Sequence, residues 1–163
     1  MALTRINNQA LTNVTSAGLP SGTVLQVVQG LYTANGSITS STLTDTGISQ
    51  SITPKSSSSK VLVLINAALG ISGTNAGEVY TQIVRGSTAI RIYERAMMIY
   101  GNDSATYHLG GSYSFCYLDS PSTTSATTYK LQGRTNSGTL RINDYYSGNN
   151  QGASTITLME IAG

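Results

Sequence analysis

Residues 60–69 read KVLVLINAAL and form the most apolar run in the chain. A strand that exposes one face to water alternates apolar and polar residues, whereas a strand covered on both faces is apolar almost throughout. Ten residues rich in Val, Leu and Ile therefore predict a central strand of a β-sheet.

Shorter segments with the alternation of half-buried strands lie on both sides of this run. A hairpin is expected around Gly86-Ser87, and a turn-rich loop is expected at residues 71–77. Residues 93–101 fit either a helix or a continuing strand. We expect an all-β fold, an antiparallel β-sandwich or jelly roll of about eight to nine strands. The segments are VLQVVQGLYT (24–33), SITSSTLTDTGISQSIT (37–53), VYTQIVR (79–85), TAIRIYERA (88–96), GSYSFCYLD (111–119) and STITLMEIA (154–162).

A second hairpin is expected near the C-terminus, where YKLQGRT (129–135) and TLRIND (139–144) flank Asn136-Ser137-Gly138. Two strand-like runs separated by a few residues that include Gly favour a hairpin. Its second strand leads into Tyr145, which predicts that this tyrosine and the loop after it lie at one end of the sandwich.

Composition bounds the class of protein. The 163 residues fit one domain, with residues 1–22 as an N-terminal arm and residues 23–163 as the head. The net charge is +2 and the Lys and Arg residues occur singly, so nucleic acid is not an expected partner. No apolar run reaches the ~20 residues that span a bilayer, so membrane insertion is not expected. Cys116 is the only cysteine, and its phase predicts a small buried hydrophobe.

The arm has two interpretations. Its apolar side chains are too sparse for a core of their own, so it is either a frayed terminus or a segment that becomes ordered against a partner. The second interpretation makes five residues candidates for anchoring, namely Leu3, Arg5, Ile6, Leu11 and Val14.

The sequence offers little for catalysis. His108 is the only histidine, no two of the seven acidic residues form a carboxylate motif, and no GxSxG is present. We therefore expect no enzyme activity, no metal and no cofactor. One alternative stays open, a carbohydrate-active enzyme whose carboxylates converge from different strands.

The chain has ten tyrosines, one Phe and no Trp. Tyrosine combines a flat apolar ring with a hydroxyl and suits recognition of sugars or proteins, although most tyrosines in strands line core margins. Two segments place tyrosines beside amide side chains and predict receptor contacts. They are Asn143, Asp144, Tyr145, Tyr146, Asn149, Asn150 and Gln151, and, as a second candidate, Tyr100 and Asn102.

Several motifs together resemble the small β-rich tail-fibre or fibre-tip virion proteins of marine tailed bacteriophages, including cyanophages. The resemblance covers residues 21–163. It is carried by DTG (45–47), SITP (51–54), SSSSKV (56–61), RGST (85–88) and STITLMEI (154–161), in this order.

This resemblance implies a virion structural protein on the tail or capsid surface, with no catalytic residues. It also implies a homotrimer whose arm inserts into another virion protein and whose loops contact the host surface, where glycan is the expected receptor. The alternative is a capsid decoration or cement protein, or a tail accessory protein, without receptor binding.

Overall fold

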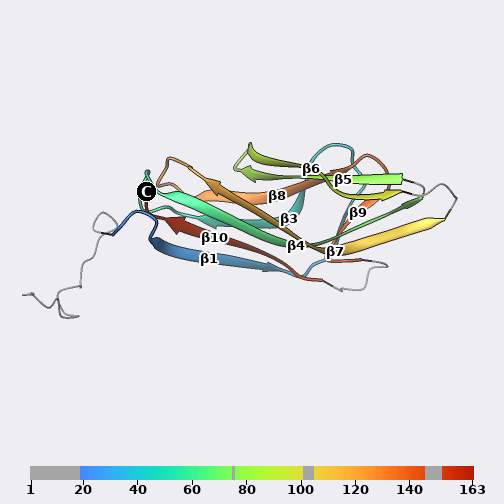
Figure 1. Cartoon of the computed structure of the whole chain (residues 1–163), viewed down its shortest axis with the longest axis horizontal. Coiled ribbons are helices and arrows are strands. Elements are labelled where there is room, and N and C mark those ends of the chain that lie inside the picture. Colours follow the sequence, from blue (N-terminus) through green and yellow to red (C-terminus); the bar gives the residue numbers. More distant parts are fainter. Residues whose placement is uncertain (1–18, 75, 101–104, 146–151) are drawn as a thin grey trace, which may run out of the picture.

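The computed structural model describes residues 19–74, 76–100, 105–145 and 152–163, and its regular elements are all β-strands. They form two sheets (Figure 1), and one hydrophobic core contains side chains from both sheets. The predicted antiparallel β-sandwich is confirmed, with ten strands in place of eight or nine. The strands are β1 (Val24–Tyr32), β2 (Gly36–Ile38), β3 (Thr44–Ile52), β4 (Lys60–Thr74), β5 (Ala76–Arg85), β6 (Thr88–Tyr100), β7 (Thr106–Asp119), β8 (Thr127–Thr135), β9 (Thr139–Ile142) and β10 (Ser154–Ile161).

Three differences from the sequence prediction account for the new count and for longer strands. Residues 37–53 divide into β2 and β3, which belong to different sheets. Residues 93–100 continue strand β6 and do not form a helix. The prediction of a loop at residues 71–77 is wrong, because β4 extends to Thr74 and β5 begins at Ala76.

Strand β4 is the central strand of the first sheet, as its apolar sequence predicts. Residues 61–74 pair with β7 along one edge. Along the other edge it pairs with β10 over residues 60–66 and with β9 over residues 69–72. Strand β1 flanks β10, and β2 flanks β9. The first sheet is therefore long, and different strands complete its two halves.

The second sheet has the order β3-β8-β5-β6. The hairpin predicted around Gly86-Ser87 joins β5 to β6 and is confirmed. Gly86 has φ +58°, which a glycine adopts without the strain that a side chain would cause. The β5–β6 register shifts between Val79 and Thr81, so residues 94–96 of β6 bulge outward beside β5.

The second predicted hairpin is wrong, because β8 and β9 lie in different sheets. The three residues between them carry the chain across the sandwich. Gly138, with φ +80°, passes so close to β4 that a Cβ there would lie 2.5 Å from the carbonyl oxygen of Ser72. The backbone N–H of Asn136 donates to the carbonyl of Glu78, which fixes the corner against β5.

The core lies between the sheets and follows the period-2 alternation of the strands. In β10 the residues at positions 154, 156, 158 and 160 are buried, and those between them are only partly buried. In strand β7 the inward and outward positions are the reverse of those predicted. Phe115 points into the core and is 5% exposed, whereas Cys116 is exposed. The prediction of a buried cysteine is therefore wrong.

The beginning and end of the described chain lie side by side at one end of the molecule. The backbone N–H of Gly22 donates to the carbonyl of Ala162, and the N–H of Ala162 donates to the carbonyl of Thr23. The opposite end of the long axis carries the ends of β4 and β6 and the start of β5 (Figure 1). We call these the proximal and distal ends. No helix in the described ranges has the length and hydropathy to cross a membrane.

Candidate receptor-binding site

A half-open cleft of about 720 Å³ lies at the distal end. It forms where the ends of β4 and β6 and the start of β5 meet the corner between β8 and β9. Its size is within the range of pockets that hold small ligands. The lining residues are Thr74, Ala76, Gly77, Glu78, Met98, Ile99, Tyr100, Asn136 and Ser137.

Glu78 and Asn136 form the polar wall of the cleft. One carboxylate oxygen of Glu78 accepts hydrogen bonds from the Tyr80 hydroxyl at 2.5 Å and from Nδ2 of Asn136 at 2.8 Å. The amide oxygen of Asn136 accepts the backbone N–H of Glu78 at 2.8 Å. Because backbone and side-chain bonds hold both residues, the wall is rigid before any ligand arrives.

Arg95 supplies a positive charge to the same network. It sits in the β6 bulge with φ +53°, and its Nε lies 3.3 Å from the second carboxylate oxygen of Glu78. The Arg95 side chain is 66% exposed and that of Glu78 is 17% exposed. The bulge therefore directs a cation from an edge strand back onto the cleft wall.

Two apolar side chains at the end of β6 also line the cleft, and Met98 lies beside Glu78 in the β5–β6 register. Tyr100 is 81% exposed and Met98 is 54% exposed. Exposed aromatic rings and amide, carboxylate and hydroxyl groups are the kinds of side chain that can hold a sugar ring, because the aromatic face covers C–H groups while the polar groups pair with hydroxyls.

The structure brings only part of the predicted receptor-contacting set to this cleft. Tyr100 lines it, and Asn102 lies outside the described residues. Glu78, Asn136 and Met98 were missed from sequence. They come from three separate strands or corners, and nothing in the local sequence links them.

Asn143 and Asp144, in the first predicted set, have buried side chains with internal partners. Nδ2 of Asn143 donates to the carbonyls of Tyr32 and Ala34 at 3.0 Å, and its Oδ1 accepts the Ser154 hydroxyl. Asp144 accepts a hydrogen bond from Arg141 at 3.0 Å. Both side chains therefore hold the segment after β9 in place.

Tyr145 lies on the outer face of the first sheet, not at an end of the sandwich. A Cβ at Gly110 would lie 2.4 Å from Cδ1 of Tyr145, so the ring rests on a position of β7 that has no side chain. A Cβ at Gly70 of β4 would lie 3.2 Å from the carbonyl oxygen of Asp144 and 3.5 Å from Cα of Tyr145, so the backbone of residues 144–145 also crosses β4. Four other residues of this candidate set fall outside the described part of the chain: Tyr146, Asn149, Asn150 and Gln151.

The anchoring candidates in the arm also lie outside the described residues. They are Leu3, Arg5, Ile6, Leu11 and Val14. The described chain begins at the proximal end, beside Ala162.

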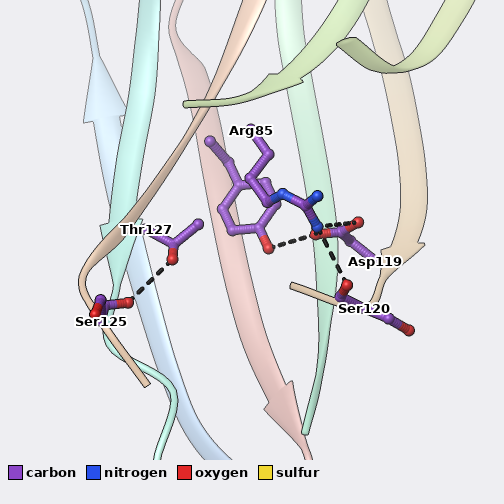
Figure 2. Close-up of polar contacts among 6 residues, drawn as sticks. Arg85, Asp119, Ser120, Ser125 and Thr127 are labelled. Atoms are coloured by element: carbon purple, nitrogen blue, oxygen red, sulfur yellow. Dashed lines mark hydrogen bonds and ion pairs between the residues drawn. The ribbon is translucent and has the colours of Figure 1, made fainter. Parts of the chain in front are cut away.

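A partly buried charged cluster lies toward the proximal end, where Asp119 of β7 pairs with Val61. Nη1 of Arg85 contacts both Asp119 carboxylate oxygens at 3.0 and 2.8 Å, and also the carbonyl of Ser120 (Figure 2). The Tyr129 hydroxyl donates to Asp119 at 2.7 Å. Burial, together with this hydrogen bond, raises the pKa of Tyr129 far above its usual range. The cluster joins β5, β7 and β8, and its polar groups serve as hydrogen-bond partners for one another.

No group of three or more His, Cys, Asp or Glu side chains within the described ranges could hold a metal ion. His108 lies in strand β7 and is exposed.

No protein-family model and no curated protein matches the chain. Among solved structures it is similar to the infectious bursal disease virus VP2 subviral particle, with 14% identity and a TM-score of 0.35. That match covers 85% of this chain and 37% of VP2. The structure of the Gx strain of the same virus gives 14% identity and a TM-score of 0.34, over 89% of this chain and 37% of that one. The chain thus spans well under half of these proteins, and TM-scores this low support no conclusion about function.

Proposed function

We propose that this chain is a virion structural protein of the tail-fibre or fibre-tip type, held to the particle at its proximal end and contacting host-surface glycan at its distal end. The observation that carries the proposal is the cleft beside Tyr100. The sequence motifs that resemble phage fibre-tip proteins support the virion assignment.

The spacing between the two ends supports this division of roles. Lys60 of β4 pairs with Ile161, which pairs with Val24 near the start of the described chain. Thr74, at the other end of β4, lines the cleft. Fourteen residues of strand at ~3.3 Å each put the cleft roughly 46 Å from the proximal end. A segment attached to the particle at one end would leave the cleft facing outward.

The proposed role is binding without catalysis. Both carboxylate oxygens of Glu78, the acidic residue of the cleft wall, have partners in Tyr80, Asn136 and Arg95. Glycoside hydrolysis needs a second carboxyl group within about 5–10 Å on the other side of the bond. Among the described residues that line the cleft there is no second carboxylate. A carbohydrate-active enzyme is therefore the less favoured alternative.

Binding of the purified protein to immobilised polysaccharides tests the glycan contact. The panel would contain lipopolysaccharides and capsular polysaccharides extracted from marine bacteria and cyanobacteria. We expect Tyr100→Ala to weaken binding at least fivefold, which corresponds to ~1 kcal/mol, while Tyr100→Phe retains it. Ile92→Ala is the matched control, because Ile92 is an exposed apolar residue of the same strand, 59% exposed, outside the cleft.

The results distinguish three cases. Loss of binding in a Tyr145→Ala, Tyr146→Ala double variant, with Tyr100→Ala unaffected, would move the site to the segment after β9. No binding to any polysaccharide would contradict the glycan contact and leave the decoration or accessory role. Release of reducing sugar from a bound polysaccharide would contradict a purely structural role.

The anchoring role of the N-terminal segment has its own test. The two sheets and their core are formed by residues 24–161, so we expect removal of residues 1–18 to leave folding intact and to abolish incorporation into particles. A truncated chain that assembles into particles normally would contradict this role.

A further inference from the structure

The outer face of the first sheet carries a continuous apolar surface in its proximal half. The pairing register places Val27 beside Met159, Met159 beside Leu62 and Leu62 beside Leu118, which is one row across four strands. Neighbouring rows on the same face add further apolar side chains. We call this set the outer apolar face: Val24, Val27, Leu31, Leu62, Leu64, Cys116, Leu118, Met159 and Ile161.

These side chains are not part of the core. Val27 is 52% exposed, Leu118 is 48% exposed and Leu31 is 66% exposed. By contrast, Leu158, the neighbour of Met159 in β10, points into the core and is 0% exposed. The sheet therefore presents apolar side chains on both faces here, and only one face has a partner among the described residues. A contiguous patch of this kind on a soluble protein marks an interaction surface.

The charge on this face restricts the class of partner. Lys60, at the proximal edge, is the single charged residue among the described outward positions of β1, β10, residues 60–66 of β4 and residues 114–118 of β7. The polar residues around the apolar row are neutral and can both donate and accept hydrogen bonds: Gln29, Asn66, Ser114, Thr155 and Thr157. An apolar centre with a neutral polar rim has the anatomy of a protein–protein interface.

A second copy of this chain fits such a face. When the face meets an identical face, apolar side chains meet apolar side chains, and hydroxyl or amide groups meet groups that can pair with them. No buried carboxylate or guanidinium is left without a partner, which is the main cost of burying charged surfaces. A partner recognised through charge would gain nothing here.

The size of the face sets the size of such a contact. Four strands ~4.8 Å apart and seven residues at ~3.3 Å each, polar rim included, give roughly 400 Å² of flat area. A standard stable interface takes about 800 Å² from each partner, so this face alone would give a contact of about half the standard size. The edge strands β1 and β7 border the face on both sides.

We propose that the outer apolar face is the contact surface between copies of this chain. The resemblance to fibre-tip proteins implies a homotrimer, whereas a face that meets an identical face forms a two-fold contact between two copies. The inference here rests on the pairing register, the exposure and the charge. It does not depend on receptor binding, so either proposal can fail without the other.

Light scattering of the full chain, with variants of this face, is the first test. We expect a mass of at least twice the 17.1 kDa of one chain. The double variant Val27→Glu, Leu118→Glu places charge on exposed positions of the face, and we expect it to be monomeric with an unchanged circular dichroism spectrum. The control Ile92→Glu, on exposed β6, should keep the wild-type mass. A monomeric wild type at every concentration, or a folded double variant of wild-type mass, would overturn the proposal.

Cys116 provides an independent readout because it is the only cysteine and lies on the outer apolar face. We expect its reaction with a maleimide to be at least tenfold slower at high protein concentration than after dilution. Fast labelling at all concentrations would show an uncovered face. Protection that is independent of concentration and lost on removal of residues 1–18 would mean that the chain's own N-terminal segment covers the face. Either result would overturn a contact between copies.

Discussion

Gly133 of β8 and Leu140 of β9 touch across the core of the sandwich. A Cβ at Gly133 would lie 2.5 Å from Cδ2 of Leu140, and Leu140 is 0% exposed. The two strands are consecutive in sequence, so the chain turns back on itself and packs one strand over the other in place of pairing them.

Gly133→Ala is expected to destabilise the protein. The added methyl group overlaps a fully buried leucine, and overpacking of this kind costs about 1–3 kcal/mol. Gly111→Ala is the control, since its Cβ would have no neighbour closer than 3.7 Å, and replacing Gly by Ala within a strand gains about 0.5–1 kcal/mol. Chemical denaturation measures both. Equal effects would mean that Gly133 and Leu140 are not in contact.

The contact between Gly110 and Tyr145 predicts a non-additive pair of substitutions. Gly110→Ala should displace the Tyr145 ring and lower the free energy of unfolding by about 1 kcal/mol. In a Tyr145→Ala background the same change should have no cost, which gives a coupling energy of about 0.5–3 kcal/mol between residues in contact. Gly111→Ala should combine additively with Tyr145→Ala. Additivity for Gly110 as well would place the ring elsewhere.

The raised pKa of Tyr129 leads us to expect that the folded protein loses stability at alkaline pH. Burial and the hydrogen bond to Asp119 raise the pKa of its hydroxyl in the folded state above the unfolded value of 10.0. The folded state therefore holds a proton that the unfolded state loses, so this contribution is complete below pH 10 and decreases as the pH rises further.

The measurement is the free energy of unfolding against pH for wild type and Tyr129→Phe. We expect the variant to lose about 1.5–3 kcal/mol at neutral pH, where a hydrogen bond to a charged group is removed, and to show a shallower decrease above pH 10. Tyr100→Phe, at an exposed position, is the control and should follow the wild type. A Tyr129→Phe curve parallel to the wild-type curve would contradict the assignment.

The lowered pKa of Glu160 leads us to expect that the folded protein loses stability at acid pH. Burial raises the pKa of this carboxyl group, but the hydrogen bonds it accepts from Nε2 of Gln26 and the backbone N–H of Lys55 outweigh burial and lower it below 4.5. The stabilisation is present above the unfolded value and is lost as the pH falls through the folded one.

Glu160→Gln should cost about 1–3 kcal/mol at neutral pH, because an amide donor then faces the donor of Gln26 in a buried site. It should also reduce the acid-induced loss of stability. Glu94→Gln, on the exposed part of β6, is the matched control. An acid unfolding midpoint that Glu160→Gln leaves unchanged would contradict the prediction.

The strands themselves could be predicted from sequence, but their partners could not. Period-2 alternation locates β7 and β10, and the uninterrupted apolar run locates β4, because each pattern reports local burial. The Asn136-Ser137-Gly138 segment has the composition of a hairpin turn and serves as a corner between sheets. The contact of Gly138 with Ser72 of β4 decides between a hairpin turn and a corner. Ser72 lies 66 residues earlier, so the local sequence around Gly138 gives no sign of this contact.

The candidate site was predicted in part for the same reason. Tyr100 was recognised because an exposed aromatic beside polar residues is a local signal. Glu78 and Asn136 are 58 residues apart and meet only because β5 pairs with β8. Cys116 was placed on the wrong face because residues 113–118 hold aromatic or apolar side chains at both phases, and such a segment can fit a sheet with either face inward.

The length of β4 also determines how the molecule carries load. Strand hydrogen bonds in antiparallel pairs run perpendicular to the strands. A pull between the cleft and the proximal end therefore acts along β4 and loads its bonds to β7, β10 and β9 together in shear, instead of opening them one at a time. The described part of the chain would then resist tension as a stiff rod, and rupture would require many bonds to break in a single event.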